Sequence, residues 1–222
     1  MLRTLLFTAL LLAFAGVSKA GLIITPSSPS PNPITAGSNG TIDFFIRADS
    51  GTQLLDGFQA TISITGGTAG GLVFSNTQLD SQLSNPNYVF AGNSLSQNTL
   101  VSVGTVTNAG LTYIGSDASD DGSAAPLAGN PVPVTLTTTD KLLFRLNLTG
   151  ITAGTYTLTI DPNVSAFYTN QLDPVNTTIG AVTLNSGQVQ VTVTAVPEPG
   201  TLSLVGVAVI GLAFFRRQKS VS

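Results

Sequence analysis

Polar and apolar residues alternate with a period of two along most of this chain, and no long helical period is visible. The alternation is clear in segments 42–47, 58–64, 142–148, 156–160 and 189–193. Successive side chains of a β-strand point to opposite faces, so this period predicts strands with one buried face and one exposed face. Threonine suits the outward positions because its branched Cβ fits a pleated surface. The pattern predicts an all-β, antiparallel, two-sheet sandwich.

Three stretches interrupt the alternation. Residues 25–33 hold four prolines and three serines. They form either a stiff spacer or a loop after a short edge strand at 22–24, and we favour the loop. Residues 78–83 predict one or two helical turns. Residues 115–139 are rich in Gly, Ser, Thr, Pro and Asp, which predicts a long irregular loop.

The N-terminal residues 1–20 have the features of a secretory signal peptide. Arg3 supplies a positive region, an apolar run spans 5–17, and Ser18-Lys19-Ala20 forms a small-x-small cleavage site. An N-terminal membrane helix is the alternative, but the apolar run is short for one. We expect signal peptidase to cut after Ala20.

The C-terminal residues 196–222 combine a short motif, an apolar span and a basic tail. The motif Pro197-Glu198-Pro199 holds the sole glutamate of the chain, residues 201–215 carry no charge, and the tail occupies 216–219. A helix over the span would be ~22 Å long, shorter than the ~30 Å hydrocarbon core of a bilayer. Long basic side chains after the span recover some of this length. A plain single-pass anchor is the alternative to a processing signal.

This order of motif, membrane helix and basic tail resembles the PEP-CTERM sorting signal. The resemblance implies export in a bacterium that makes exopolysaccharide, and recognition by an exosortase, a membrane-embedded cysteine transpeptidase. By that resemblance Pro197, Glu198 and Pro199 are the recognised residues, while Arg216 and Arg217 hold the tail in position. None of them would be catalytic in this protein.

The body between the two signals spans residues 21–195, enough for one domain with a core. Its basic residues are Arg47, Lys141 and Arg145, which stand against ten aspartates and leave a net charge of −7. Nucleic acid requires a basic face, and anionic lipid attracts basic clusters. The charge balance therefore argues against both partners.

The residue types that the chain lacks limit the chemistry that the body can perform. The chain contains no histidine, no cysteine and no tryptophan. Ser-His-Asp and Cys-His catalysis, histidine general bases and zinc sites of the ordinary ligand types are therefore excluded. Paired aspartates remain open as glycosidase groups, but no pair stands out by its context. We therefore expect a protein that is not an enzyme and that needs no cofactor.

The order of turns and strands in the body carries a second resemblance. It rests on Ala36-Gly37 before the strand at 41–47, Leu55-Asp56-Gly57-Phe58 opening the next strand, the strand at 142–148 before 153–158, and Ser186-Gly187-Gln188-Val189 near the end. This order is similar to that of cohesin and cohesin-like jelly-roll domains, from which the chain departs at 115–139. The resemblance implies a jelly-roll sandwich and a glycan- or protein-binding role.

One segment is a candidate calcium site. Asp117, Ser119 and Asp121 occupy alternate positions before Gly122, like the opening of a calcium loop. The twelfth position is Ala128, where such a loop would have a bidentate acid. A solvated acidic loop without calcium is therefore the alternative, and we favour it.

Aromatic rings on the surface of the body are candidates for stacking on sugars. They are Tyr88, Tyr113, Phe167 and Tyr168. In the alternative interpretation, Phe167 fills the core and the tyrosines cover sheet edges.

These features together predict an exported protein. We expect transient anchoring in the inner membrane by the C-terminal helix, then release to the cell surface or the extracellular matrix. A structural or adhesive role in a biofilm matrix, in contact with extracellular polysaccharide, is the first interpretation. A non-catalytic module that binds a glycan or a protein is the alternative, and an enzyme ranks third.

Overall fold

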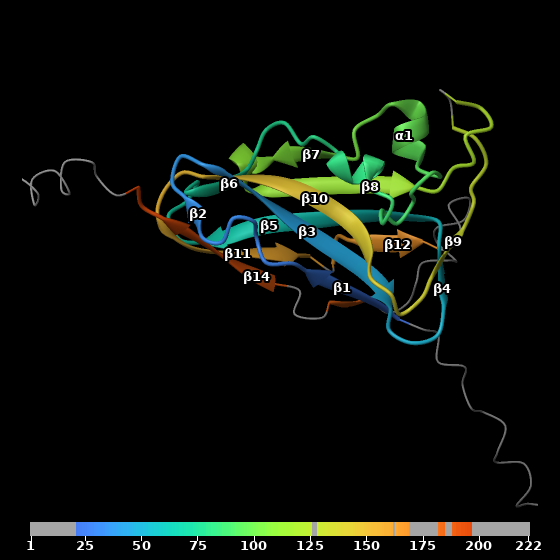
Figure 1. The fold of residues 1–222 in the computed structure, drawn as a ribbon, viewed down its shortest axis with the longest axis horizontal. Helices are drawn as coiled ribbons and strands as arrows, with labels where there is room; N and C mark the ends of the chain where they lie inside the picture. The colour runs from blue at the N-terminus through green and yellow to red at the C-terminus, as the bar shows by residue number, and fades with distance from the viewer. Residues whose placement is uncertain (1–20, 126–127, 162, 169–181, 185–187, 197–222) are drawn as a thin grey trace, which may run out of the picture.

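The computed structural model describes residues 21–125, 128–161, 163–168, 182–184 and 188–196. Two β-sheets pack face to face in this part of the chain, with the helix α1 (Leu95–Thr99) and a two-stranded sheet at one end (Figure 1). The predicted all-β sandwich is confirmed.

The five-stranded sheet has the order β13-β1-β3-β10-β6. Its strands are β1 (Leu22–Pro26), β3 (Asn39–Ala48), β6 (Leu72–Phe74), β10 (Lys141–Gly150) and β13 (Val182–Leu184). The long strands β3 and β10 pair antiparallel at the centre. The strand predicted at 22–24 is present, but it lies between β3 and β13 and is not an edge strand.

The seven-stranded sheet has the order β2-β14-β11-β5-β8-β7, with β12 also paired to β5. Its strands are β2 (Ile34–Thr35), β5 (Gly57–Gly66), β7 (Gly104–Thr107), β8 (Thr112–Ala118), β11 (Gly154–Ile160), β12 (Ala166–Tyr168) and β14 (Gln188–Thr194). The short 3-10 helix η2 (Asn108–Gly110) joins β7 to β8. β5 occupies the centre and is paired along its length.

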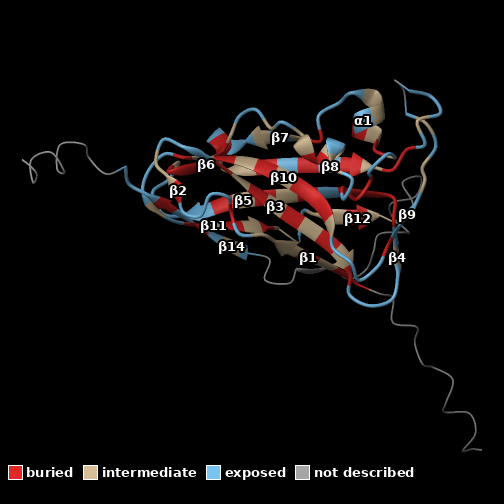
Figure 2. Cartoon of the chain, in the orientation of Figure 1, coloured by how far each residue is buried: buried red, intermediate tan, exposed pale blue. Residues whose placement is uncertain are grey.

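Side chains alternate between the core and the surface along these strands, as the sequence period requires. In β3 every second residue from Gly40 to Ala48 is buried, and Figure 2 shows the same alternation along the other long strands. Aromatic rings fill the centre between the sheets: Phe58 meets Phe144 edge-on at 5.0 Å, and Tyr113 meets Phe144 edge-on at 5.6 Å. Such edge-to-face pairs add to the stabilisation from burial alone.

Two strand pairs correct the prediction of purely antiparallel sheets. β1 pairs parallel with β13, and β14 pairs parallel with β2. In both cases a strand near the end of the body runs beside a strand near its start. These pairings join strands that are distant in sequence. The period of two is a local pattern and does not predict which strands pair.

The proline-rich segment 25–33 begins with the last two residues of β1, and its residues 27–33 form a loop bound to β3. The amide of Ser27 donates to the Asp43 carbonyl oxygen at 2.7 Å, and Ser30 and Thr41 exchange two backbone hydrogen bonds of 2.8 Å. A spacer would lie free of the sheets. The interpretation of this segment as a loop is therefore confirmed.

Two short helical segments precede β7. The predicted turn at 78–83 is a single 3-10 turn, η1 (Ser81–Ser84). The α-helix α1 (Leu95–Thr99) was not predicted, although Ser94 caps it by accepting a hydrogen bond from the Gln97 amide at 3.1 Å. Serine followed three residues later by glutamine is a sequence signal for such a cap.

The prediction of one irregular loop over 115–139 is wrong at both ends. β8 continues to Ala118, and β9 (Val134–Leu136) pairs with β4 (Gln53–Leu55) in the two-stranded sheet. In β8 the inward positions 115 and 117 hold glycine and aspartate instead of apolar side chains. These two residues interrupt the alternation of polar and apolar residues, so the sequence pattern predicts a loop instead of a strand.

The two targeting segments lie outside the described residues. These are the predicted signal peptide at 1–20 and, except for Val196, the sorting region at 196–222. In the part of the chain that the structure describes, every helix is too short to cross a bilayer. The predicted helix at 201–215 and the domain boundaries therefore stay predictions.

Candidate functional site

The outer surface of the seven-stranded sheet carries hydroxyl and amide side chains. We call its outward strand residues the neutral face, because none of the described ones is charged. The strand registers align them in rows, one of which joins Gln188, Thr159, Ser63, Thr112 and Thr107 across five strands. The face therefore offers hydrogen-bond donors and acceptors without an electrostatic preference.

A groove of about 620 Å³ lies at the α1 end of the neutral face. Its floor comes from β5 and β8, where Gly57 is paired with Ala118. The half-buried Tyr168 of β12, paired with Gly57, and helix α1 also line it. Its exposed polar residues include Gln59, which is paired with Ser116. The volume falls within the usual range for small-molecule sites.

Asp117 fixes the geometry of the groove from beneath. One carboxylate oxygen accepts from the Tyr88 hydroxyl at 2.7 Å and from the Ser94 hydroxyl at 2.6 Å. The other accepts from the amides of Ser96 at 3.0 Å and Ala118 at 2.8 Å. Asp117 is only 5% exposed, so these four donors offset the cost of burying its charge. The carboxylate links α1 to β8, and its acceptor positions are occupied by donors of the protein itself.

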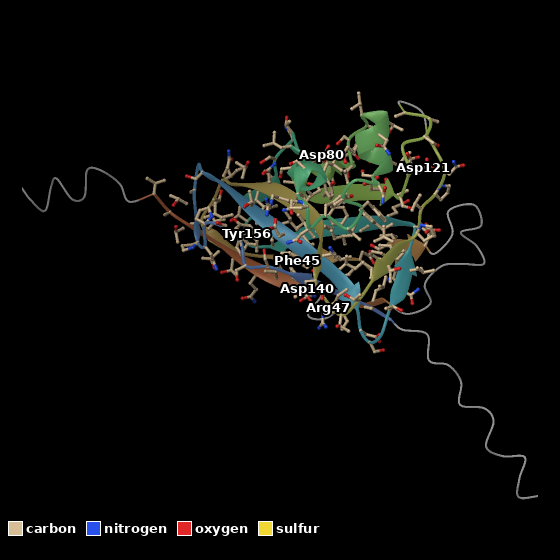
Figure 3. The ribbon with its side chains drawn as sticks, turned by 45° about the vertical axis from the view of Figure 1, so that its right-hand side comes forward. Phe45, Arg47, Asp80, Asp121, Asp140 and Tyr156 are labelled. Atoms are coloured by element: carbon tan, nitrogen blue, oxygen red, sulfur yellow. The ribbon has the colours of Figure 1, made fainter. Side chains whose placement is uncertain are left out.

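The loop after β8 is held by the next two aspartates. The Asp120 carboxylate accepts from the Asn98 side chain at 2.7 Å and from the amides of Gly122 and Gly129. Hydrogen bonds from Ser123 and Asn130 hold the pKa of Asp121 well below its ordinary value. Both carboxylates therefore organise the loop beside α1, where Figure 3 labels Asp121.

The three candidate calcium residues have separate environments. Asp117 faces the interior, Ser119 is buried at 2% exposure, and the Asp121 carboxylate bonds to its own loop. Among the described residues, no group of three or more acidic side chains lies close enough together to hold a metal ion. Alternation along β8 explains the arrangement of Asp117, because position 117 points into the core.

Three of the four proposed sugar-stacking rings are buried. Tyr88, Tyr113 and Phe167 are at most 1% exposed and belong to the core, so they present no ring to a ligand. Burial, reinforced by Asp117, raises the pKa of the Tyr88 hydroxyl, and burial likewise raises that of Tyr113. Tyr168 remains, half-buried at the groove. Gln59 and Ser116 were missed as site residues because only the strand register brings them beside it.

The outer surface of the five-stranded sheet differs from the neutral face, because it carries paired charges. The Arg145 guanidinium donates two hydrogen bonds to the Asp43 carboxylate, at 2.8 and 2.7 Å, and this contact raises the pKa of Arg145. Arg47 lies 3.4 Å from Asp140, near Phe45 in Figure 3. We call this surface the charged face.

Comparison with known proteins identifies the C-terminal signal. Residues 195–218 match the PEP-CTERM protein-sorting motif. The match begins directly after β14 and contains all five residues that the sequence assigns to sorting: Pro197, Glu198, Pro199, Arg216 and Arg217. These five lie outside the described residues, so their individual roles stay predictions. No curated protein matches the chain.

Solved structures identify the fold of the body. The third cohesin of ScaC from Acetivibrio cellulolyticus, solved in complex with the ScaB dockerin, shares 12% identity with a TM-score of 0.50, covering 78% of this chain and 99% of that one. A cohesin module of a family 33 glycoside hydrolase from Clostridium perfringens also matches, with 12% identity and a TM-score of 0.45 over 80% and 99% of the two chains. The body has a cohesin-like β-sandwich fold, followed by a PEP-CTERM sorting motif. At such identity the likeness concerns the fold alone.

Proposed function

We propose that this is an exported, exosortase-processed protein of the cell surface or extracellular matrix, with a structural or adhesive, non-catalytic body. The sorting motif at 195–218 carries the proposal. It follows the last strand of the sandwich without a second domain between them. Processing at this motif would separate the body from its membrane segment.

The body supports a non-catalytic role through its acidic residues. Asp117 and Asp120 are buried at 5% and 2% exposure, and both carboxylates hold local structure. A glycosidase needs two carboxyl groups that flank a reactive bond. The aspartates beside the groove serve its architecture instead, while the neutral face offers a broad polar surface for contact with the matrix.

A single substitution tests the sorting step. Glu198→Ala removes the only glutamate of the motif, so we expect export to continue while C-terminal processing stops. Immunoblots of membrane and matrix fractions should then show a larger species retained in the membrane. Asp161→Ala, in the turn after β11, serves as a matched control for loss of one acidic group. Normal maturation of the Glu198→Ala variant would contradict the proposal.

A binding module for a partner protein is the second candidate. The cohesin module from Acetivibrio cellulolyticus was solved with a dockerin bound, and the neutral face is broad enough for protein contact. Pull-down of a defined partner by the wild type, lost when Thr157 of β11 is changed to lysine, would favour this candidate. Matrix enrichment without such a partner would favour the structural role.

A further inference from the structure

We propose that the groove between α1, Tyr168 and the end of the neutral face binds a neutral polysaccharide chain. The inference rests on the proposed function, because a matrix protein is exposed to such polymers, and it assigns a ligand class to one site. The juxtaposition that carries it is an aromatic ring beside a floor of small residues, with amide and hydroxyl groups at the rim.

The floor of the groove is shaped for a flat, partly apolar ligand. The strand registers place Tyr168, Gly57 and Ala118 in one row across β12, β5 and β8. Tyr168 therefore lies beside a glycine and an alanine. Because these side chains are small, they leave space for a ligand next to the tyrosine. A pyranose ring has an apolar C–H face that packs on such aromatic and aliphatic surface, as apolar groups do on aromatic rings in general.

The rim supplies the polar contacts. Gln59 and Ser116 are directly paired in the next row of the sheet, and both are exposed. Thr99 of α1 and Ser102 also line the groove, but their hydroxyls already donate to the Leu95 carbonyl oxygen and to Asp80, so they offer a ligand acceptors only. The amide of Gln59 and the hydroxyl of Ser116 can each donate and accept a hydrogen bond. This set complements the hydroxyl groups around the edge of a sugar ring, which also donate and accept.

The charges of the groove and of the body favour a neutral polysaccharide over an acidic one. The sole charged lining residue is Asp117, and its carboxylate already accepts four hydrogen bonds from the protein. No lining residue is a cation that would bind a carboxylate or sulfate of an acidic polysaccharide. The body as a whole carries −7, so it repels anionic polymers at low salt. A neutral glycan meets neither obstacle.

Electrophoresis of the protein purified from its producing cells, in gels containing a dissolved polysaccharide, tests the ligand class. Hydroxyethyl cellulose and glucomannan serve as neutral polymers and alginate as the acidic one. We expect retardation by at least one neutral polymer and none by alginate. Mobility unchanged in both neutral polymers, or retarded by alginate alone, would overturn the proposal.

Variants locate the site. Tyr168→Ala should weaken the affinity for the retarding polymer about five- to tenfold, the scale of one aromatic contact. Tyr168→Phe should retain most of it, because the ring remains. Gln59→Ala should weaken it about threefold or more, the scale of one hydrogen bond. Thr157→Ala, on the neutral face but outside the groove, is the matched control.

Thermal unfolding of each variant separates loss of the site from loss of the fold. Undiminished binding by a folded Tyr168→Ala variant would overturn the proposal, as would equal weakening by Thr157→Ala. Matrix enrichment of the wild type is measured in parallel. Enrichment without polysaccharide binding would refute this inference and leave the proposed function standing, while binding without sorting would refute the proposed function alone.

Discussion

The two outer surfaces of this sandwich place their polar groups differently. On the charged face, Arg145 pairs with Asp43 and Arg47 with Asp140, all on or beside the central strands β3 and β10. On the neutral face, one row of glutamine, threonine and serine crosses five strands. The aspartate nearest the groove, Asp117, is buried under it.

Aspartate therefore has a different structural role on the charged face and beneath the neutral face. A partly exposed carboxylate paired to arginine contributes little to stability, because water and salt screen the interaction. A buried carboxylate with four donors holds several segments together, and its removal leaves all four unsatisfied. The described part of the neutral face therefore carries no exposed charge, while the buried Asp117 beneath the groove holds the segments that line it.

The largest effect should follow from removal of that buried carboxylate. We expect Asp117→Ala to lower the free energy of unfolding by about 3 kcal/mol or more, because the Tyr88 and Ser94 hydroxyls and two amides lose their acceptor. Urea titration followed by circular dichroism measures it. Asp121→Ala, on the exposed loop, is the control and should cost clearly less. Equal losses would mean that burial does not distinguish the two carboxylates.

A pair of tyrosines should give an intermediate effect. Tyr88→Phe removes the hydroxyl that donates to Asp117, at an expected cost of about 2 kcal/mol. The Tyr113 hydroxyl is buried and has no hydrogen-bond partner among the described residues, so Tyr113→Phe removes an uncompensated polar group and should not lower the free energy of unfolding. The same urea titrations compare the two variants. A larger loss for Tyr113→Phe would contradict the assignment of Asp117 as the centre of the network.

The same tyrosines predict a dependence on alkaline pH. Burial raises both pKa values above the ordinary value of 10.0. A raised pKa in the folded state means that the unfolded chain loses the proton first, so stability is complete below pH 10 and falls as the pH rises beyond it. Each phenylalanine variant should therefore lose stability less steeply above pH 10 than the wild type.

The smallest effect belongs to the charged face. Asp43→Ala should lower the free energy of unfolding by about 0.5–1 kcal/mol, since Arg145 is partly exposed. Asp140→Ala, which breaks the longer contact to Arg47, should cost less. Stability measured at low and high salt checks the cause, because screening should reduce both losses. A loss for Asp43→Ala as large as that for Asp117→Ala would remove the distinction between the two faces.

The period of two in the sequence was sufficient to predict the sandwich and most of its long strands. It failed in β8, where Gly115 and Asp117 occupy inward positions. An aspartate in the core is stable there because Tyr88 and Ser94, 29 and 23 residues earlier in the sequence, supply donors. Such compensation between distant residues is not visible in a local pattern.

The candidate site was predictable only in part. The sorting motif is contiguous, so sequence alone located it. The groove is assembled from β5, α1, β8 and β12 by pairing between strands far apart in the chain. Tyr168 was predicted among four aromatic candidates, but no local pattern separates it from the three that lie in the core.

The intact mass of the protein recovered from the extracellular matrix tests the proposed sorting most directly. We expect a species that begins at Gly21 and lacks the apolar span at 201–215, with or without an attached group at its new C-terminus. A matrix species that still carries residues 201–222, or a protein found only in the membrane with that segment attached, would contradict it.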